Sequence, residues 1–123
     1  MNKGLKAKLF RGLGDPTRLA VLEALRPGPR CVSDLAQVTR LAQPNLSMHL
    51  ACLRACGLVR ARRNGRFVYY ELADPRVIEV LHGAEQLLQS IARRLEACPR
   101  YETATNSDGQ PTRTRRELRL RRR

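Results

Sequence analysis

The sequence has no apolar run long enough to cross a bilayer, and its N-terminus lacks the hydrophobic core of a signal peptide. We therefore expect a cytoplasmic protein. Acidic residues are scarce, because 11 Asp and Glu stand against 24 Lys and Arg and leave a formal net charge of +13. Lysine is scarce too, so arginine dominates the positive charge. Arginine binds phosphates and guanine edges through two parallel hydrogen bonds. This composition favours a polyanionic partner, either nucleic acid or an anionic membrane surface.

Features of an enzyme are also missing. No glycine-rich loop is present that could stabilise an oxyanion, and no acid stands beside His49 to orient it as a base for Cys52. We therefore predict that the chain is not an enzyme and that it needs no organic cofactor. The arginine run near the C-terminus lacks an aromatic or acyl anchor, so we expect no membrane partner.

The length of 123 residues fits one domain of ordinary size. Residues 99–123 carry eight arginines against three acids, with few apolar residues. A segment of this kind cannot bury enough surface to offset the entropy cost of ordering. We therefore predict a domain over residues 1–98 and a basic, disordered tail over 99–123. The tail is either a solvated end or an arm that binds phosphates without sequence preference.

Apolar spacing predicts helices over residues 5–13, 16–26, 32–38 and 43–56. Asp15 and Pro16 suit the start of the second helix, and Gly57 suits the end of the fourth. The third and fourth helices flank a tight turn, which is the helix-turn-helix arrangement. The inward side chains are expected to be Leu19, Leu22, Leu25, Leu35, Val38, Leu46, Leu50 and Leu53.

From Leu58 the apolar period changes from that of a helix to two, and Asn64-Gly65 is a strong signal for a hairpin turn. Residues 58–72 therefore predict a β-hairpin. A last helix is expected from Asp74-Pro75 to about Cys98. Its apolar stripe exceeds what so small a core can cover, so we assign part of it to a dimer interface. The predicted fold is mainly α with a β-hairpin wing, a winged helix-turn-helix.

In this arrangement the second helix of the pair enters the major groove of double-stranded DNA. With its leucines turned inward, polar and small side chains face the groove, where Gln and Asn can read adenine edges. The hairpin tip is a compact cationic finger that suits phosphates or a narrow minor groove. The DNA-binding candidates are Gln43, Pro44, Asn45, Ser47, Met48, Arg62, Arg63 and Arg66.

Several spaced motifs of the chain resemble the ArsR/SmtB family over roughly residues 9–95. The resemblance implies a dimer formed by the first and last helices, which represses transcription and releases operator DNA on binding metal. It rests on motifs that occur in order: Leu13-Gly-Asp-Pro-Thr-Arg-Leu19, Ser33-Asp-Leu-Ala36, Gln43-Pro-Asn-Leu-Ser-Met-His-Leu50, Gly57-Leu-Val59 and Asn64-Gly-Arg-Phe-Val-Tyr-Tyr70.

Two cysteines four residues apart, Cys52 and Cys56, would stack on one face of the predicted fourth helix. Soft metal ions prefer thiolate ligands. The segment Cys52-Leu-Arg-Ala-Cys56, with Cys98 after the last helix, is similar to the cadmium- and lead-sensing branch of the family. The resemblance thus implies a metal site of Cys52, Cys56 and Cys98, with Cd²⁺ or Pb²⁺ as effector and Hg²⁺ or As(III) as further candidates.

Other sites of the family fit this chain less well. The arsenic-type site would need a second thiol beside Cys31, where Ser33 stands, and the zinc-type site would find only His82 and Glu85 on the last helix. Two other functions use the same fold. One is a redox or persulfide sensor that crosslinks Cys31 or Cys56 with Cys98, and the other is a DNA-binding structural protein that senses nothing.

Overall fold

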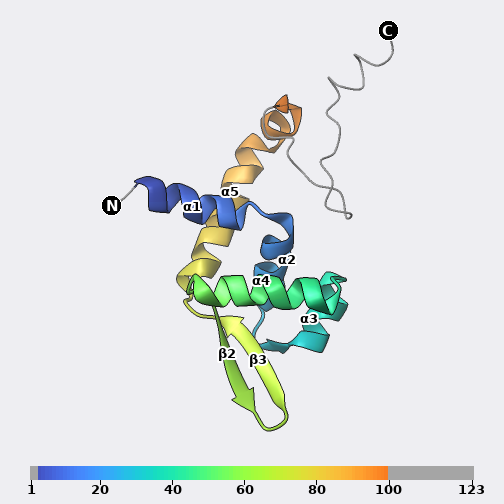
Figure 1. Cartoon of the computed structure of the whole chain (residues 1–123). Helices are drawn as coiled ribbons and strands as arrows, with labels where there is room; N and C mark the ends of the chain where they lie inside the picture. The colour runs from blue at the N-terminus through green and yellow to red at the C-terminus, as the bar shows by residue number, and fades with distance from the viewer. Residues whose placement is uncertain (1–2, 100–123) are drawn as a thin grey trace. The chain divides into compact units, whose positions relative to one another are not determined.

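Five helices and three short strands make up the described part of the chain, residues 3–99 of the computed structural model (Figure 1). The predicted tail lies outside the described residues, apart from Pro99. Contacts divide the chain into two units, with the boundary inside the last helix after Val80. The elements are α1 Lys3–Leu13, α2 Pro16–Leu25, β1 Arg30–Cys31, α3 Val32–Thr39, α4 Gln43–Ala55, β2 Val59–Asn64, β3 Phe67–Leu72 and α5 Arg76–Ala97.

Helix α2 begins as predicted. The Asp15 carboxylate accepts a hydrogen bond from the Arg18 backbone N–H at 3.0 Å, and Pro16 occupies the first turn. This cap satisfies one of the N–H groups that a helix start leaves without a partner. Helix α1 starts two residues earlier than predicted and buries none of its side chains. The α1 helix is thus held through only part of its surface, against α2.

The core of the N-terminal unit lies where α2, α3 and α4 meet one another and the sheet. Two predicted core residues are not part of it. Leu19 is 36% exposed and Val38 is 52% exposed. Position 39, four residues after Leu35, stays closer to the buried face of α3 than position 38 does, and Thr39 is indeed half-buried there. The buried apolar residues of this unit are Val21, Leu22, Ala24, Leu25, Leu35, Leu46, Leu50, Leu53, Val59 and Val77.

The helix-turn-helix is formed by α3 and α4. Arg40 adopts a left-handed conformation, with φ of 61°, and ends α3. Helix α4 ends at a glycine with positive φ, Gly57 at 78°. The Gly57 N–H donates to the Arg54 carbonyl, and the Leu58 N–H donates to the Leu53 carbonyl, both at 3.0 Å. These bonds occupy carbonyls at the helix end, so Gly57 has the predicted capping role.

The predicted hairpin is present, and it projects beside α4 in Figure 1. Asn64 pairs with Phe67 across the turn, and Gly65 has a positive φ of 62°. A third strand, β1, pairs antiparallel with β3 and gives the sheet order β1-β3-β2. The sequence did not predict β1, because two residues are too short for a pattern of period two.

Helix α5 begins after Asp74-Pro75, as predicted. The Asp74 carboxylate accepts hydrogen bonds from the Arg76 backbone N–H at 2.9 Å and from the Arg76 guanidinium. Along α5, Val77 and Leu81 are buried, whereas other apolar side chains of the helix are exposed, namely Val80, Leu87 and Leu88. No helix among residues 3–99 is long and apolar enough to span a bilayer.

Candidate nucleic-acid interface and thiol site

The N-terminal half of α4 presents the predicted DNA-reading side chains to solvent. Its buried residues are the three predicted leucines, Leu46, Leu50 and Leu53. This orientation turns the intervening residues outward, and Met48 is 60% exposed. The exposed candidates on this helix are Gln43, Pro44, Asn45, Ser47 and Met48. The structure therefore brings together on one helix the groups predicted to enter the groove.

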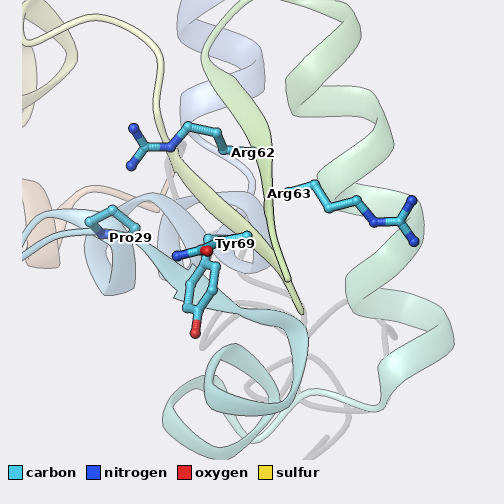
Figure 2. A pocket seen from close by; sticks show the side chains of 5 residues that line it. Pro29, Arg62, Arg63 and Tyr69 are labelled. Atoms are coloured by element: carbon cyan, nitrogen blue, oxygen red, sulfur yellow. The ribbon is translucent and has the colours of Figure 1, made fainter. Parts of the chain in front are cut away.

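The arginines of the hairpin divide between its two faces. Arg62 lies opposite Tyr69, whereas Arg63 lies opposite Val68. Successive side chains of a strand point to opposite faces. Figure 2 shows this directly: Arg62 lies on the side of Pro29 and Tyr69, and Arg63 points the other way. A hollow of about 450 Å³ is lined by residues of both faces near the tip, namely Pro29, Arg62, Arg63, Asn64 and Tyr69.

A carboxylate of the hairpin holds two of its arginines. Glu71 lies directly opposite Arg60, and its Oε1 accepts a hydrogen bond from Arg60 Nε at 2.7 Å. The other oxygen, Oε2, lies 3.6 Å from Arg62 Nη2. Within residues 3–99, Arg63 and Arg66 have no acidic partner. Glu71 was not among the predicted residues, although counting outward from the Asn64-Gly65 turn pairs it with Arg60.

The thiols Cys52 and Cys56 line one hollow at the other end of α4. Cys52 is half-buried, Cys56 is exposed, and both are free thiols. The Cys56 backbone N–H donates to the Cys52 carbonyl at 3.0 Å, which keeps the helical spacing up to the cap. The hollow has a volume of about 440 Å³ and is formed by α1, α2, α4 and the segment after it. The residues that line it are Leu5, Lys8, Leu9, Gly12, Arg18, Cys52, Leu53, Ala55, Cys56 and Leu58.

The other two thiols lie elsewhere. Cys98 follows α5 directly, in the C-terminal unit, and its N–H donates to the Leu95 carbonyl at 3.1 Å. Cys31 occupies the N-cap position of α3 without a side-chain capping hydrogen bond, and its Sγ lies 3.1 Å from Ser33 Oγ. Among the described residues, no three side chains of His, Cys, Asp or Glu gather closely enough to hold a metal ion. The pair Cys52 and Cys56 therefore supplies two soft ligands, and a third would have to come from beyond this hollow.

Two cations of the thiol hollow were not predicted from the sequence. Lys8 comes from α1 and Arg18 from α2, and both line the hollow with Cys52 and Cys56. No spacing rule connects residues 8, 18 and 52, because only tertiary packing brings them together.

Known proteins with similar sequences identify the family of this chain. The model of the bacterial regulatory protein family arsR matches residues 15–61, which run from the α2 cap into β2. A probable mercury resistance operon repressor of Streptomyces lividans is 39% identical over 94 residues, covering 76% of this chain and 75% of the relative. The transcriptional regulator CmtR of Mycobacterium tuberculosis is 41% identical over 91 residues, covering 74% and 77%. The chain belongs to the ArsR family.

Membership in the ArsR family confirms the resemblance read from the sequence. The homodimeric winged helix-turn-helix DNA-binding domain of Mb0332 from Mycobacterium bovis, a possible ArsR-family regulator, superposes with a TM-score of 0.59 at 32% identity. It matches 69% of this chain and 78% of that domain. The predicted winged helix-turn-helix fold is therefore confirmed. ArsR-family proteins are DNA-binding transcriptional regulators, so this chain is a regulator and not an enzyme.

Proposed function

We propose that this ArsR-family protein is a metal-responsive repressor, which binds operator DNA as a homodimer and releases it when a soft heavy-metal ion binds Cys52 and Cys56. Cd²⁺ and Pb²⁺ are the first candidates, with Hg²⁺ and As(III) next. One observation carries the proposal: α4 exposes the proposed DNA-reading residues at its N-terminal half, and the thiol pair lines one hollow at its C-terminal end.

The short distance along α4 makes coupling between the two sites direct. Ser47 and Cys52 are five residues apart, which corresponds to a rise of about 8 Å along a helix. A helix of 13 residues moves as a rigid rod, so a force on the thiols changes the position of the reading residues. Metal and DNA then oppose each other reciprocally, with a coupling free energy of about 1–3 kcal/mol, or roughly 5-fold to 150-fold in affinity.

The donor set fits a soft ion. Thiolates are the ligands that soft ions prefer, whereas Mg²⁺ and Ca²⁺ prefer oxygen ligands. Cys52 and Cys56 face the same hollow, and no carboxylate lines it. We propose Cys98, from the same or the partner subunit, as the third ligand. With all three thiolates on one ion, the end of α4 would be joined to the segment that follows α5.

DNA binding is proposed to need two copies of the chain. Two reading helices related by a two-fold axis fit half-sites about 34 Å apart, one turn of DNA. Exposed apolar side chains on α1 and α5 are suited to cover one another in a dimer. In each subunit α4 would read bases, while the tip arginines Arg62, Arg63 and Arg66 would contact phosphates.

Substitution of single thiols tests the proposal. Cys52→Ser and Cys56→Ser should bind operator DNA like wild type, because neither residue belongs to the reading set, but Cd²⁺ should no longer release the DNA. Fluorescence anisotropy on upstream DNA, titrated with Cd²⁺, Pb²⁺, Hg²⁺ or arsenite, measures both properties. Cys31→Ser is the matched control and should keep the full metal response. Normal metal release by both Cys52→Ser and Cys56→Ser would rule out the site.

The same variants separate metal sensing from redox or persulfide sensing. A redox sensor would release DNA on oxidant or persulfide without metal, and mass spectrometry would then show a crosslink to Cys98. A DNA-binding protein that senses nothing would keep its affinity under every treatment.

A further inference from the structure

The thiol hollow is not electrically neutral. Of its ten lining residues, two are thiols, two are the cations Lys8 and Arg18, and the rest are apolar or glycine. No acidic residue lines it, so nothing inside the hollow balances the two positive charges.

The Arg18 guanidinium is incompletely satisfied. Its Nε is buried and has no hydrogen-bond partner within residues 3–99, and it is the one such side-chain atom among them. The neighbouring Asp15 carboxylate is used by the Arg18 backbone N–H, at 3.0 Å, as the cap of α2. Buried polar groups almost always have a partner, and burying a cation without one costs free energy. A buried donor beside two thiols in the same hollow is suited to an anionic group there.

The charge that metal binding creates depends on the ion. Three neutral thiols that bind Cd²⁺ or Pb²⁺ release three protons, so the complex carries one net negative charge. Arsenious acid, As(OH)₃, reacts with three thiols to form three As–S bonds and releases three waters, so that complex is neutral. Hg²⁺ held by two thiolates is neutral as well. Charges interact more strongly in a partly buried hollow than in water. One negative charge beside two cations therefore changes the free energy of metal binding substantially.

We propose that Arg18 and Lys8 form a charge-balancing shell around the Cys52–Cys56 site, which favours the anionic thiolate complexes of divalent ions over neutral ones. This inference rests on the proposed function and adds what selects the effector. Arg18 and Lys8 are positioning residues, because they act on the bound ion through the thiolates. The shell also links α1 and α2 to the thiols of α4.

Direct metal binding to the full-length protein tests the shell. The probes are Cd²⁺, followed by thiolate-to-metal absorbance in competition with a chelator, and arsenite, followed by loss of free thiols. Arg18→Gln should weaken Cd²⁺ binding about 10-fold to 100-fold, the usual effect of removing an outer-shell partner. Arsenite binding should stay within about twofold, because its complex has no charge to balance. Arg11→Gln, on exposed α1 surface outside the hollow, removes the same charge and should leave both affinities unchanged.

Lys8→Gln is the second variant, for the case in which Arg18→Gln does not fold. Lys8 is exposed, so its substitution leaves the core intact. It should weaken Cd²⁺ binding in the same selective way, by a smaller factor. Two results would overturn the inference: Cd²⁺ affinities of both variants equal to that of Arg11→Gln, or equal losses for Cd²⁺ and arsenite. If wild type and Cys52→Ser bind Cd²⁺ equally, the proposed metal site at the thiols is ruled out, and the proposed shell is ruled out as well.

Discussion

Asp74 is the residue whose ionisation the structure changes most clearly. Its carboxylate accepts hydrogen bonds from both the guanidinium and the backbone N–H of Arg76, which lower its pKa from 3.8 to about 2. The same contact raises the pKa of Arg76 above its ordinary value. The carboxylate also stands at the N-terminus of α5, where the helix dipole favours negative charge.

The pH dependence of stability follows from the lowered pKa. Because the folded-state pKa lies below the unfolded value, the stabilisation by Asp74 is fully present above about pH 4 and is lost as the pH falls toward 2. Thermal unfolding of wild type and Asp74→Asn should therefore differ at pH 5 and converge near pH 2. Asp34→Asn, which removes an exposed carboxylate from α3, provides the control curve. A gap between wild type and Asp74→Asn that stays constant down to pH 2 would contradict this role.

Individual residues differ in how far the sequence predicts them. The spacing of Cys52 and Cys56 is local, so a helical pattern was enough to place both thiols on one face, and the structure has them in one hollow. The cations beside them come from α1 and α2, which lie more than thirty residues earlier in the chain. Tertiary packing places these cations beside the thiols, and the spacing of residues along the sequence does not predict such packing.

Among the elements, the hairpin has a carboxylate that neutralises part of its positive charge. Glu71 is largely buried, with a side chain 14% exposed, and it occupies Arg60 and Arg62. Arg66, at the turn, has no such acid among residues 3–99. Among residues 3–99, the hairpin arginines without an acidic partner, Arg63 and Arg66, therefore lie next to the turn.

Changes at the two positions should have opposite effects on DNA binding. Arg66→Ala should weaken binding to all sequences and reduce the slope of log affinity against log salt by about one, as expected for a lost phosphate contact. Glu71→Gln should strengthen binding to all sequences and steepen that slope, because it releases Arg60 and Arg62. Glu96→Gln changes the net charge equally at an exposed position outside the hairpin, near the end of α5, and is the control. Anisotropy over a salt series measures the slopes, and an unchanged slope in both hairpin variants would remove the hairpin from the interface.

Local signals decided which elements could be predicted. The Asn64-Gly65 turn and the Gly57 cap each need a particular backbone conformation, so they fixed the hairpin and the end of α4 within one residue. Strand β1 has only two residues and exists because β3 offers it a pairing edge. The prediction that Val38 is buried was wrong because position 39, four residues after Leu35, lies closer to the buried face of α3.

For the molecule as a whole, the apolar surface of the single chain exceeds what its own core covers. Helix α1 buries no side chain, and Phe10 on it is 60% exposed. The sequence indicated such an excess on the last helix, but a single chain cannot show which surfaces meet in a dimer. Large exposed apolar patches commonly mark contacts with other proteins.

A charge placed on this surface tests the proposed dimer. Phe10→Glu should leave the fold intact, because the side chain is outside the core, but should make the protein monomeric by placing a carboxylate in the interface. Operator affinity should then fall about 100-fold or more, because each subunit binds its half-site without help from the other. Val38→Glu makes the same kind of change on exposed α3 surface and should remain dimeric. Analytical ultracentrifugation gives the oligomeric state, and a dimeric Phe10→Glu protein would show that α1 lies outside the interface.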